Sequence, residues 1–263
     1  MSSFKADCHR LLGACLVLAA CGLAGPAMAI GDGSKLEVAQ IRYAGNWDSR
    51  PRAALVLAQE IRRRTSIDVR LERIVVDIDD PRLFYRPLLL LLGDGRLRFT
   101  DKERGRLKTW IEAGGFLLID NTGRSEPSTA FDSSVRAEMS AMFPGRGLVK
   151  VPPEHVVFRT FFKLGFPWGR AIHRPFIEGL FIDGRIAVLY TQNDLTGALD
   201  RDKLGAFTFD VSPNEEAREK AIRFAVNLVQ YAMCLDYKDD QVHLDYLLHR
   251  RRWRIKPPEI KAP

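Results

Sequence analysis

Cysteine is scarce in this sequence of 263 residues, which contains four of them. Cys8, Cys15 and Cys21 lie close to the N-terminus, and Cys234 is the fourth. Beyond the N-terminal segment a single cysteine remains, and it cannot form an internal disulfide, so the fold has to be stabilised by its hydrophobic core. The apolar neighbours of Cys234 indicate a buried helical thiol rather than a nucleophile.

Standard catalytic and cofactor motifs are also missing. The sequence has no HExxH zinc motif, no Walker loop, no GxGxxG dinucleotide motif and no CxxC pair. The GxSxG turn of serine hydrolases is absent as well. Internal repeats and low-complexity stretches are not found. Any function therefore has to be inferred from less specific features.

Residues 1–29 have the composition of a secretory signal peptide. Lys5 and Arg10 precede an apolar stretch, and Ala27 and Ala29 provide a cleavage site. The stretch is too short and too rich in Gly and Ala to predict a membrane span. The segment ending at Cys21 also fits a bacterial lipoprotein processing site, which would leave Cys21 acylated. We therefore expect an exported protein that is periplasmic, or lipid-anchored in the envelope through Cys21.

The formal net charge is +7, and basic side chains are concentrated only near the C-terminus. There the expected tail, residues 236–263, contains the segment HRRRWRIK from His249 to Lys256. Such a tail is usually solvated, although it could also contact an anionic membrane surface or an acidic partner protein. We expect no nucleic-acid partner, because the protein is expected to be exported.

Strand and helix patterns alternate along residues 30–235 and predict one α/β domain. Five consecutive leucines, Leu88 to Leu92, are typical of a parallel strand that is buried on both faces. Further strands are expected at 35–43, 69–78, 116–119 and 185–194, and helices near 49–65 and 133–143. The alternation predicts a doubly wound, mainly parallel sheet with helices on both faces.

One helix carries clear signals at both ends. Thr100 and Glu103 are spaced as a capping box at its start. Gly114-Gly115 ends the helix by supplying a left-handed cap. With the strands before and after it, this helix forms a βαβ unit.

The later part of the chain is less regular until its last helix. Residues 153–184 are rich in aromatic residues, Gly and Pro, which predicts short strands and a long loop. The closing helix is expected to begin with a second capping box, Ser212 with Glu215, and with Pro213 at the first helical position.

Polar residues follow the predicted strands at the end where ligands bind in open parallel sheets. With His155 from the irregular segment, the candidate ligand-binding residues are Gly93, Asp94, Asp120, Asn121, His155, Asn193 and Asp194. Asp120, His155 and Asp194 are the candidates for catalysis, because such side chains act as acids, bases or ligands of a divalent metal. No particular metal or other cofactor is indicated. Each position taken alone is also typical of a strand-end turn.

Several segments of the chain occur in a characteristic order. They include IRYAGNWDSRPRA, LLLLLGDG, WIEAGGFLLIDNT, IDGRIAVLYTQNDLTGAL and AVNLVQYAM. This ordered set resembles the bacterial family of unknown function called DUF4159. The likeness extends from about Lys35 to Arg252.

That family is similar to the class I glutamine amidotransferase-like superfamily, near its ThuA-like branch, which implies a flavodoxin-like sheet. Amidotransferases carry a nucleophilic cysteine in a tight turn after a strand, but here the corresponding strand ends at Asp120-Asn121. Without a thiolate at that position, a glutaminase reaction is not expected. The ThuA-like branch suggests a sugar-related ligand. Relatives that accompany membrane-associated von Willebrand A and MoxR-type ATPase proteins suggest an envelope protein as partner.

Three functional hypotheses result, and the third is a membrane-surface scaffold that places Arg250, Arg251, Arg252 and Arg254 at the lipid. In the first, this is an exported cell-envelope protein whose domain binds a ligand or a partner protein at the sheet edge without catalysis. The missing nucleophile and the aromatic segment from Phe158 to Trp168 favour it. In the second, it is a hydrolase or carbohydrate-modifying enzyme that uses the strand-end carboxylates and His155, with or without a divalent metal. The second hypothesis requires those side chains to converge around a pocket.

Overall fold

The computed structural model describes residues 35–234, and Leu36 to Cys234 fall within one compact unit. The expected signal peptide, the lipidation site at Cys21 and the basic tail lie outside the described residues. The expectations about these three features remain predictions. Within residues 35–234, no helix is long and apolar enough to cross a membrane.

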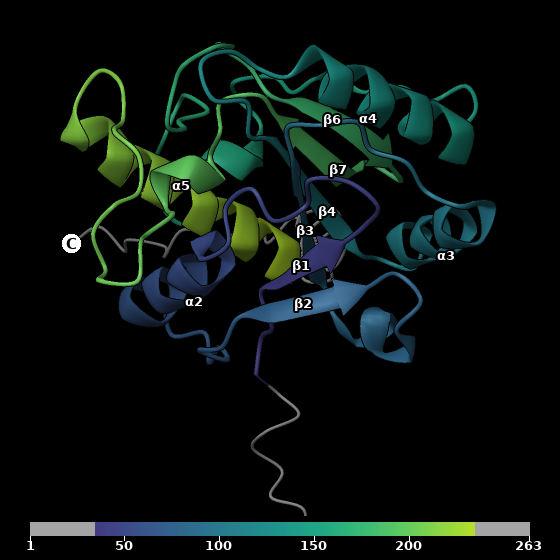
Figure 1. Cartoon of the computed structure of the whole chain (residues 1–263), viewed down its shortest axis with the longest axis horizontal. Helices are drawn as coiled ribbons and strands as arrows, with labels where there is room; N and C mark the ends of the chain where they lie inside the picture. The colour runs from purple at the N-terminus through teal and green to yellow at the C-terminus, as the bar shows by residue number, and fades with distance from the viewer. Residues whose placement is uncertain (1–34, 235–263) are drawn as a thin grey trace, which may run out of the picture. The chain divides into compact units, whose positions relative to one another are not determined.

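A seven-stranded sheet forms the centre of this unit (Figure 1). Its strands are β1 (Ala39–Arg42), β2 (Ile74–Asp77), β3 (Leu88–Gly93), β4 (Phe116–Asn121), β5 (Val149–Lys150), β6 (Glu178–Ile182) and β7 (Arg185–Thr191). They lie in the order β2-β1-β3-β4-β7-β6-β5. The first five strands of that order are parallel, and β6 and β5 extend the sheet by antiparallel pairing. The predicted mainly parallel α/β fold is confirmed.

Four helices cover the sheet: α2 (Ala53–Arg64), α3 (Asp101–Glu112), α4 (Thr129–Met142) and α5 (Glu215–Met233). The short 3-10 helices are η1 (Pro81–Tyr85), η2 (Val156–Phe158) and η3 (Thr196–Ala198). The helices α2 and α5 pack on one face, and α3 and α4 pack on the other (Figure 1). The sheet is therefore doubly wound, as the alternating pattern predicts.

The leucine strand β3 explains why both faces are covered. Leu88, Leu90 and Leu92 enter the core beneath α2 and α5, while Leu89 and Leu91 enter the core beneath α3 and α4. All five are completely buried. Successive side chains of a strand point to opposite faces, so a continuous apolar run requires helices on both.

The start and end of α3 follow its local sequence. Thr100 Oγ1 accepts from the Glu103 backbone N–H at 3.2 Å, and Glu103 Oε2 accepts from the Thr100 backbone N–H at 2.8 Å. Gly114 has a φ of 112°, which favours glycine. At Gly115 an added Cβ would lie 2.4 Å from the Trp110 ring, so the close approach of this side chain requires glycine there. The predicted capping box and glycine end are confirmed.

The beginnings of the other helices differ from the predictions. The N-cap of α5 is Asn214, whose side chain accepts from the Ala217 N–H, so the predicted capping box at Ser212 is wrong. The Ser212–Pro213 peptide is cis and lies before the helix. Cys234 follows α5 as its C-cap and is half-buried rather than fully buried.

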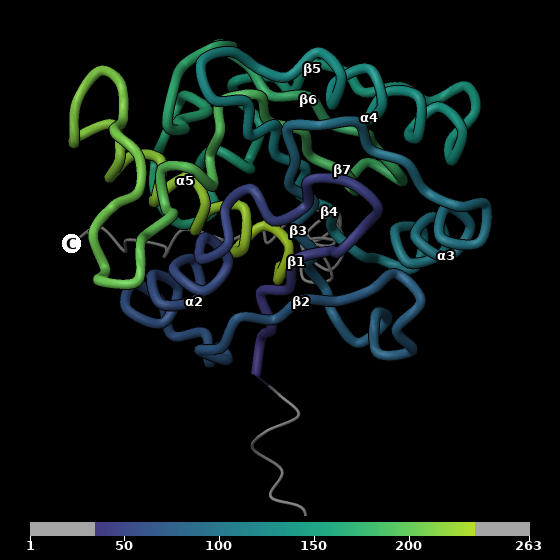
Figure 2. The backbone as a smooth tube through the Cα atoms, in the orientation of Figure 1, coloured from purple at the N-terminus to yellow at the C-terminus, as the bar shows by residue number. Residues whose placement is uncertain are grey.

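The helix α2 begins at Ala53, a few residues after the predicted start near Ser49 and Pro51. The residue before it, Arg52, has no capping side chain of its own. Instead, Asp200 Oδ1 accepts from the Arg52 backbone N–H at 2.9 Å. Asp200 belongs to the long connection from β7 to α5, which passes beside α2 (Figure 2). A residue distant in sequence therefore fixes where α2 starts.

Candidate functional site

The strand order reverses between β1 and β3, where ligands commonly bind in parallel sheets. In this chain the side chain of Tyr43 fills the space between the ends of β1 and β3, and its hydroxyl donates to the Leu92 carbonyl at 3.0 Å. A Cβ added to Gly93 would lie 2.2 Å from the Tyr43 hydroxyl, so glycine is needed for packing at this predicted site position. Burial raises the pKa of Tyr43, which keeps the phenol neutral as a donor.

Asp94, another predicted site residue, helps to close the same position. Its Oδ1 accepts from Asn46 Nδ2 at 2.6 Å, which joins the loop after β3 to the loop after β1. Gly45 packs against the backbone of Arg96, because a Cβ there would lie 3.0 Å from the Arg96 carbonyl oxygen. The usual crevice between these two loops is consequently filled by protein.

Asp120 is completely buried near the end of β4. Its Oδ1 accepts from the Leu195 N–H at 3.1 Å. Its Oδ2 accepts from the Thr196 N–H at 2.7 Å and from the Thr196 hydroxyl at 2.5 Å. Burial first, and the charge of Asp194 second, raise the pKa of Asp120 to about 7. Both carboxyl oxygens are therefore engaged in holding the start of η3.

Asp194 is also completely buried, and two arginines surround it. Arg50 donates from Nε to Oδ1 at 3.0 Å and from Nη2 to Oδ2 at 2.6 Å, and Arg170 Nε also donates to Oδ2. The Gly197 backbone N–H donates to Oδ1 at 3.1 Å. With a φ of 48°, Asp194 adopts a left-handed conformation that Asp tolerates better than most residues. These contacts hold the strained turn in place.

The ends of β1, β3, β4 and β7 are called here the carboxyl edge of the sheet. At this edge Arg50, which follows β1, contacts the chain after β4 and the chain after β7. Besides Asp194, its Nη2 donates to the Thr122 carbonyl at 2.9 Å. Its guanidinium lies 4.2 Å from the centre of the Phe209 ring. The side chain is 3% exposed, so the charge is enclosed by these partners. The result is a rigid, buried ionic network.

The predicted site residues Asn121 and Asn193 organise loops. Asn121 Oδ1 accepts from the Ser128 N–H at 2.8 Å, and its Nδ2 donates to the Ser128 carbonyl at 2.9 Å. Asn193 Oδ1 accepts from the Arg174 N–H at 2.8 Å, and its Nδ2 donates to the Pro167 carbonyl at 2.8 Å. Both asparagines are fully buried. Their amides take the place of backbone partners in the two loops.

His155 does not join the other predicted site residues. Its Nδ1 accepts from the Val157 N–H at 3.2 Å, and its ring centre lies 5.7 Å from that of Tyr231. Tyr231 accepts from the N–H of Ile186, near the beginning of β7, whereas Asp120 pairs with Thr191 at the end of that strand. His155 and Asp120 are consequently at opposite ends of β7, separated by roughly 16 Å of strand.

The structure thus brings six of the seven candidates to the carboxyl edge, although each has its own structural partners. Within residues 35–234, no three His, Cys, Asp or Glu side chains are grouped so that they could hold a metal ion. The arginines Arg50 and Arg170 were not among the candidates. Arg50 stands in the connection after a strand and could have been included by the same rule. Arg170 has no comparable signal because it comes from the irregular segment.

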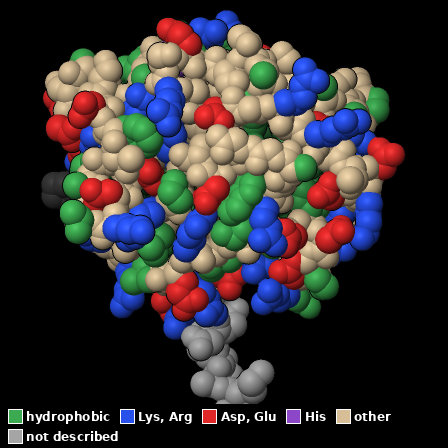
Figure 3. All heavy atoms as spheres, in the orientation of Figure 1, with side chains coloured by type: hydrophobic (Ala, Val, Ile, Leu, Met, Phe, Trp, Pro, Cys, Tyr) green, Lys and Arg blue, Asp and Glu red, His purple; other side chains and the backbone are tan. Residues whose placement is uncertain are grey.

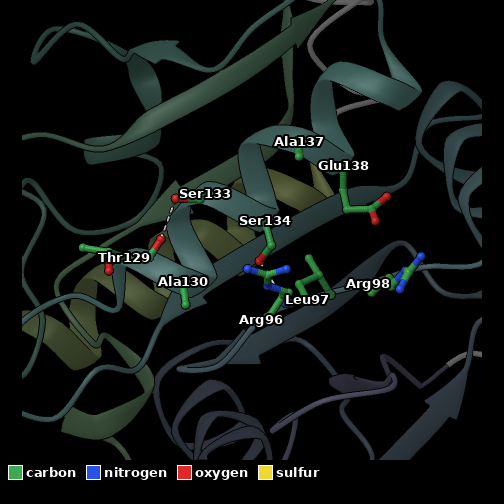
Figure 4. A pocket seen from close by; sticks show the side chains of 9 residues that line it. All are labelled: Arg96, Leu97, Arg98, Thr129, Ala130, Ser133, Ser134, Ala137 and Glu138. Carbon is green, nitrogen blue, oxygen red and sulfur yellow. Dashed lines mark hydrogen bonds between the residues drawn. The ribbon is translucent and has the colours of Figure 1, made fainter.

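A cleft lies beside this edge, between the chain after β3 and the first turns of α4 (Figure 4). Its volume is about 520 Å³. It is lined by Arg96, Leu97, Arg98, Thr129, Ala130, Ser133, Ser134, Ala137 and Glu138. None of these residues was a predicted site residue, because the cleft depends on how α4 packs against a loop more than thirty residues earlier in the chain.

Comparison with known protein families agrees with the resemblance inferred from the sequence segments. No curated protein matches the chain. The sequence model of a family described as a domain of unknown function matches residues 37–233. This range includes the seven strands of the sheet and the four helices that cover it. On this evidence the chain belongs to the DUF4159 family.

Proposed function

We propose that this protein is a non-catalytic binding domain of the bacterial cell envelope, which takes a ligand or a partner protein beside the carboxyl edge of its sheet. One observation carries the proposal. The two buried strand-end carboxylates, Asp120 and Asp194, already accept hydrogen bonds from backbone N–H groups, a hydroxyl and two guanidinium groups. They stabilise loops instead of facing a substrate.

Catalysis by these groups would need a different geometry. A general acid or base has to lie within about 2.6–3.2 Å of the proton that it transfers, or one water molecule away. Asp120 and Asp194 are completely enclosed, and His155 is at the other end of β7. The alternative of a hydrolase or carbohydrate-modifying enzyme that uses these three side chains gains no support from this arrangement.

Kinship with the amidotransferase-like superfamily is part of the proposal. The parallel strands β2, β1, β3, β4 and β7 have the flavodoxin-like order, which supports this kinship. The strand β4 ends in Asp120-Asn121 and continues into Thr122, so no thiol stands where a nucleophile would be needed. We infer a domain that kept the scaffold for binding, without the residue for acyl transfer.

Export is the second part of the proposal and has a direct test. Mass spectrometry of the protein from envelope fractions should find an N-terminus at Ile30, or an acylated N-terminal Cys21. A Cys21→Ala variant distinguishes the two, because it prevents lipidation while leaving cleavage after Ala29 available. An intact N-terminus on protein recovered from the cytoplasm would contradict export.

The basic tail is proposed to contact anionic lipid headgroups at the membrane surface. We expect the Cys21→Ala protein to sediment with vesicles that contain phosphatidylglycerol, and less so in high salt. Deletion of residues 249–263 should abolish sedimentation, while vesicles of phosphatidylcholine alone should recruit neither protein. Equal sedimentation of the intact and shortened proteins would contradict this contact.

The non-catalytic part of the proposal is tested at Asp94, the strand-end carboxylate that is partly exposed. Asp94→Asn removes the charge but keeps the oxygen that accepts from Asn46. In a strain that lacks the gene, we expect this variant to restore every phenotype of the deletion. A folded and abundant Asp94→Asn protein that fails to restore them would overturn the non-catalytic proposal. Melting temperature and immunoblotting serve as controls for folding and abundance.

A further inference from the structure

The cleft beside α4, called here the Arg96 cleft, is lined by positive charge that has no partner among residues 35–234. Neither Arg96 nor Arg98 makes a hydrogen bond or ion pair through its side chain with any residue between 35 and 234. Arginines elsewhere in the unit are commonly paired, as Arg64 is with Glu60 and Glu219. Among the described residues Arg62 and Arg146 also have no side-chain partner, so what distinguishes Arg96 and Arg98 is that both line the same cleft.

The single carboxylate of the lining does not neutralise them. Glu138 is 7% exposed, and its Oε2 accepts from Arg104 Nε at 2.8 Å. Its Oε1 accepts from the Phe99 N–H at 3.1 Å. Because Arg104 already balances Glu138, Arg96 and Arg98 leave the cleft with a net positive charge.

Both walls of the cleft are held in place by hydrogen bonds. Ser134 Oγ accepts from the Leu97 N–H at 2.8 Å and donates to the Phe131 carbonyl at 2.8 Å. The Phe99–Glu138 contact joins the walls again further along. Figure 4 shows Arg96, Leu97 and Ser134 near the middle of the cleft, with Thr129 towards one end and Arg98 towards the other. A site that is already formed loses less entropy when it binds a ligand.

On the face shown in Figure 3, the Lys and Arg side chains are interspersed with Asp and Glu side chains and form no broad basic surface. Recognition of an anion therefore has to come from particular side chains. Guanidinium groups bind carboxylate and phosphate through paired, charge-assisted hydrogen bonds, and the hydroxyl of Thr129 lines the same cleft.

We propose that the Arg96 cleft binds a small acidic molecule through a carboxylate or phosphate group held by Arg96 and Arg98. The volume of about 520 Å³ suits a small ligand. This inference rests on the proposed binding function and names the chemical class of its ligand. The loops after β1 and β3 are closed by Tyr43 and Asn46, so the ligand position is displaced from the usual crevice to the neighbouring gap before α4.

The test uses the full-length protein in low-salt buffer and three probes, which are inorganic phosphate, citrate and glucose. Binding is followed by amide chemical shifts in NMR titrations. We expect saturable shifts at residues 96–98 and 129–138 with citrate or phosphate, and none with glucose. Preference for citrate or for phosphate identifies which acidic group the cleft takes. Shifts that are equal for glucose, or that cluster away from these residues, would overturn the proposal.

Variants assign the binding to particular side chains. Arg96→Gln and Arg98→Gln are each expected to weaken binding of the preferred anion about tenfold, because a charge-assisted contact is lost. Arg62→Gln, at an exposed arginine of α2, is the matched control and should change nothing. Equal effects at positions 62 and 96 would contradict the assignment to the cleft.

A size variant separates cleft binding from general attraction of anions. Ala137 is exposed and lines the cleft, so Ala137→Phe should block the ligand without disturbing the core. Ser140→Phe, at an exposed position of the same helix outside the lining, is its control. If Ala137→Phe binds citrate and phosphate as the wild type does, the proposed site is wrong.

The two proposals fail in different ways. Loss of anion binding by every measure, with Asp94→Asn still functional in the cell, would remove the Arg96 cleft and leave the non-catalytic proposal. A folded Asp94→Asn protein that binds anions normally but does not restore the phenotypes in the cell would overturn the non-catalytic proposal and leave the Arg96 cleft.

Discussion

Buried charge at Asp194 shows how single residues shape this protein. Taking a carboxylate and two guanidinium groups out of water has a large free-energy cost, which their mutual attraction and hydrogen bonds offset. Arg50, Arg170 and Asp194 come from three separate connections, so the network also fixes the relative positions of those connections. Removing one member leaves uncompensated charge inside the protein.

The first prediction concerns this network. Asp194→Asn is expected to lower the free energy of unfolding by about 3 kcal/mol, because it leaves Arg50 and Arg170 without their anion. Asparagine also tolerates the left-handed backbone, so the loss comes from the side-chain charge and from the one acceptor oxygen that an amide replaces with NH2, not from backbone strain. Asp77→Asn is the control, since the pair of Asp77 with Arg42 is half-exposed and its loss should lower stability much less. Denaturant unfolding measures both, and similar losses would contradict the prediction.

The second prediction concerns pH. Because the pKa of Asp120 is raised to about 7 in the folded protein, this state holds a proton that the unfolded chain releases near pH 4. The contribution to stability is therefore present below about pH 4 and is lost as the pH rises to about 7. Asp120→Asn has no proton to lose, so its free energy of unfolding should fall less between pH 4 and pH 7 than that of the wild type. The two falls should differ by about 1 kcal/mol or more. An unchanged difference in denaturant unfolding would contradict it.

At the scale of elements, helix ends are determined in two different ways. The beginning of α3 is fixed by residues that are neighbours in the sequence, Thr100 and Glu103. The beginning of α2 depends instead on Asp200, which is distant in the sequence. The first kind of end can be predicted from the sequence, whereas the second requires the tertiary structure.

The third prediction tests the local cap of α3. Thr100→Ala is expected to lower the free energy of unfolding by about 1 kcal/mol, because the Glu103 backbone N–H loses its acceptor. Thr109→Ala, at an exposed position inside the same helix, should be neutral or slightly stabilising, since alanine has the higher helix propensity. Thermal and denaturant unfolding measure the stability of both variants. An equal change in the free energy of unfolding for Thr100→Ala and Thr109→Ala would contradict a role for the cap.

At the scale of the whole unit, one sheet couples two apolar cores. The leucines of β3 alternate between them, so neither core can lose its packing without exposing side chains of the shared strand. Trp110 belongs to the core beneath α3 and α4, and Trp168 packs against the other. The fluorescence of Trp110 therefore reports on the packing of one face of the sheet, and that of Trp168 on the packing of the other.

The fourth prediction is that both faces unfold together. In two variants that retain only Trp110 or only Trp168, the fluorescence midpoint in denaturant should coincide with the midpoint from far-UV circular dichroism. The comparison is made within each variant, so destabilisation by the tryptophan replacements does not affect it. A fluorescence transition that precedes the loss of secondary structure in either variant would indicate independent faces.

Local signals predicted much of the fold and little of the site. The continuous leucines of β3 and the capping box of α3 were sufficient because each depends on neighbouring residues. The predicted cap at Ser212 was wrong since Asn214 competes for the same role. The strand-end rule found Asp194, but its enclosure by Arg50 and Arg170 depends on contacts across more than twenty residues.

The sequence by itself determined that parallel strands alternate with helices and that polar residues emerge at one edge of the sheet. Periodicity and capping are interactions between neighbours, so they are visible without a structure. Only the tertiary structure decided that Asp120 and Asp194 are enclosed, that His155 lies at the opposite end of β7, and that Arg96 faces an open cleft. Packing between distant segments decides which polar groups are desolvated and which remain accessible.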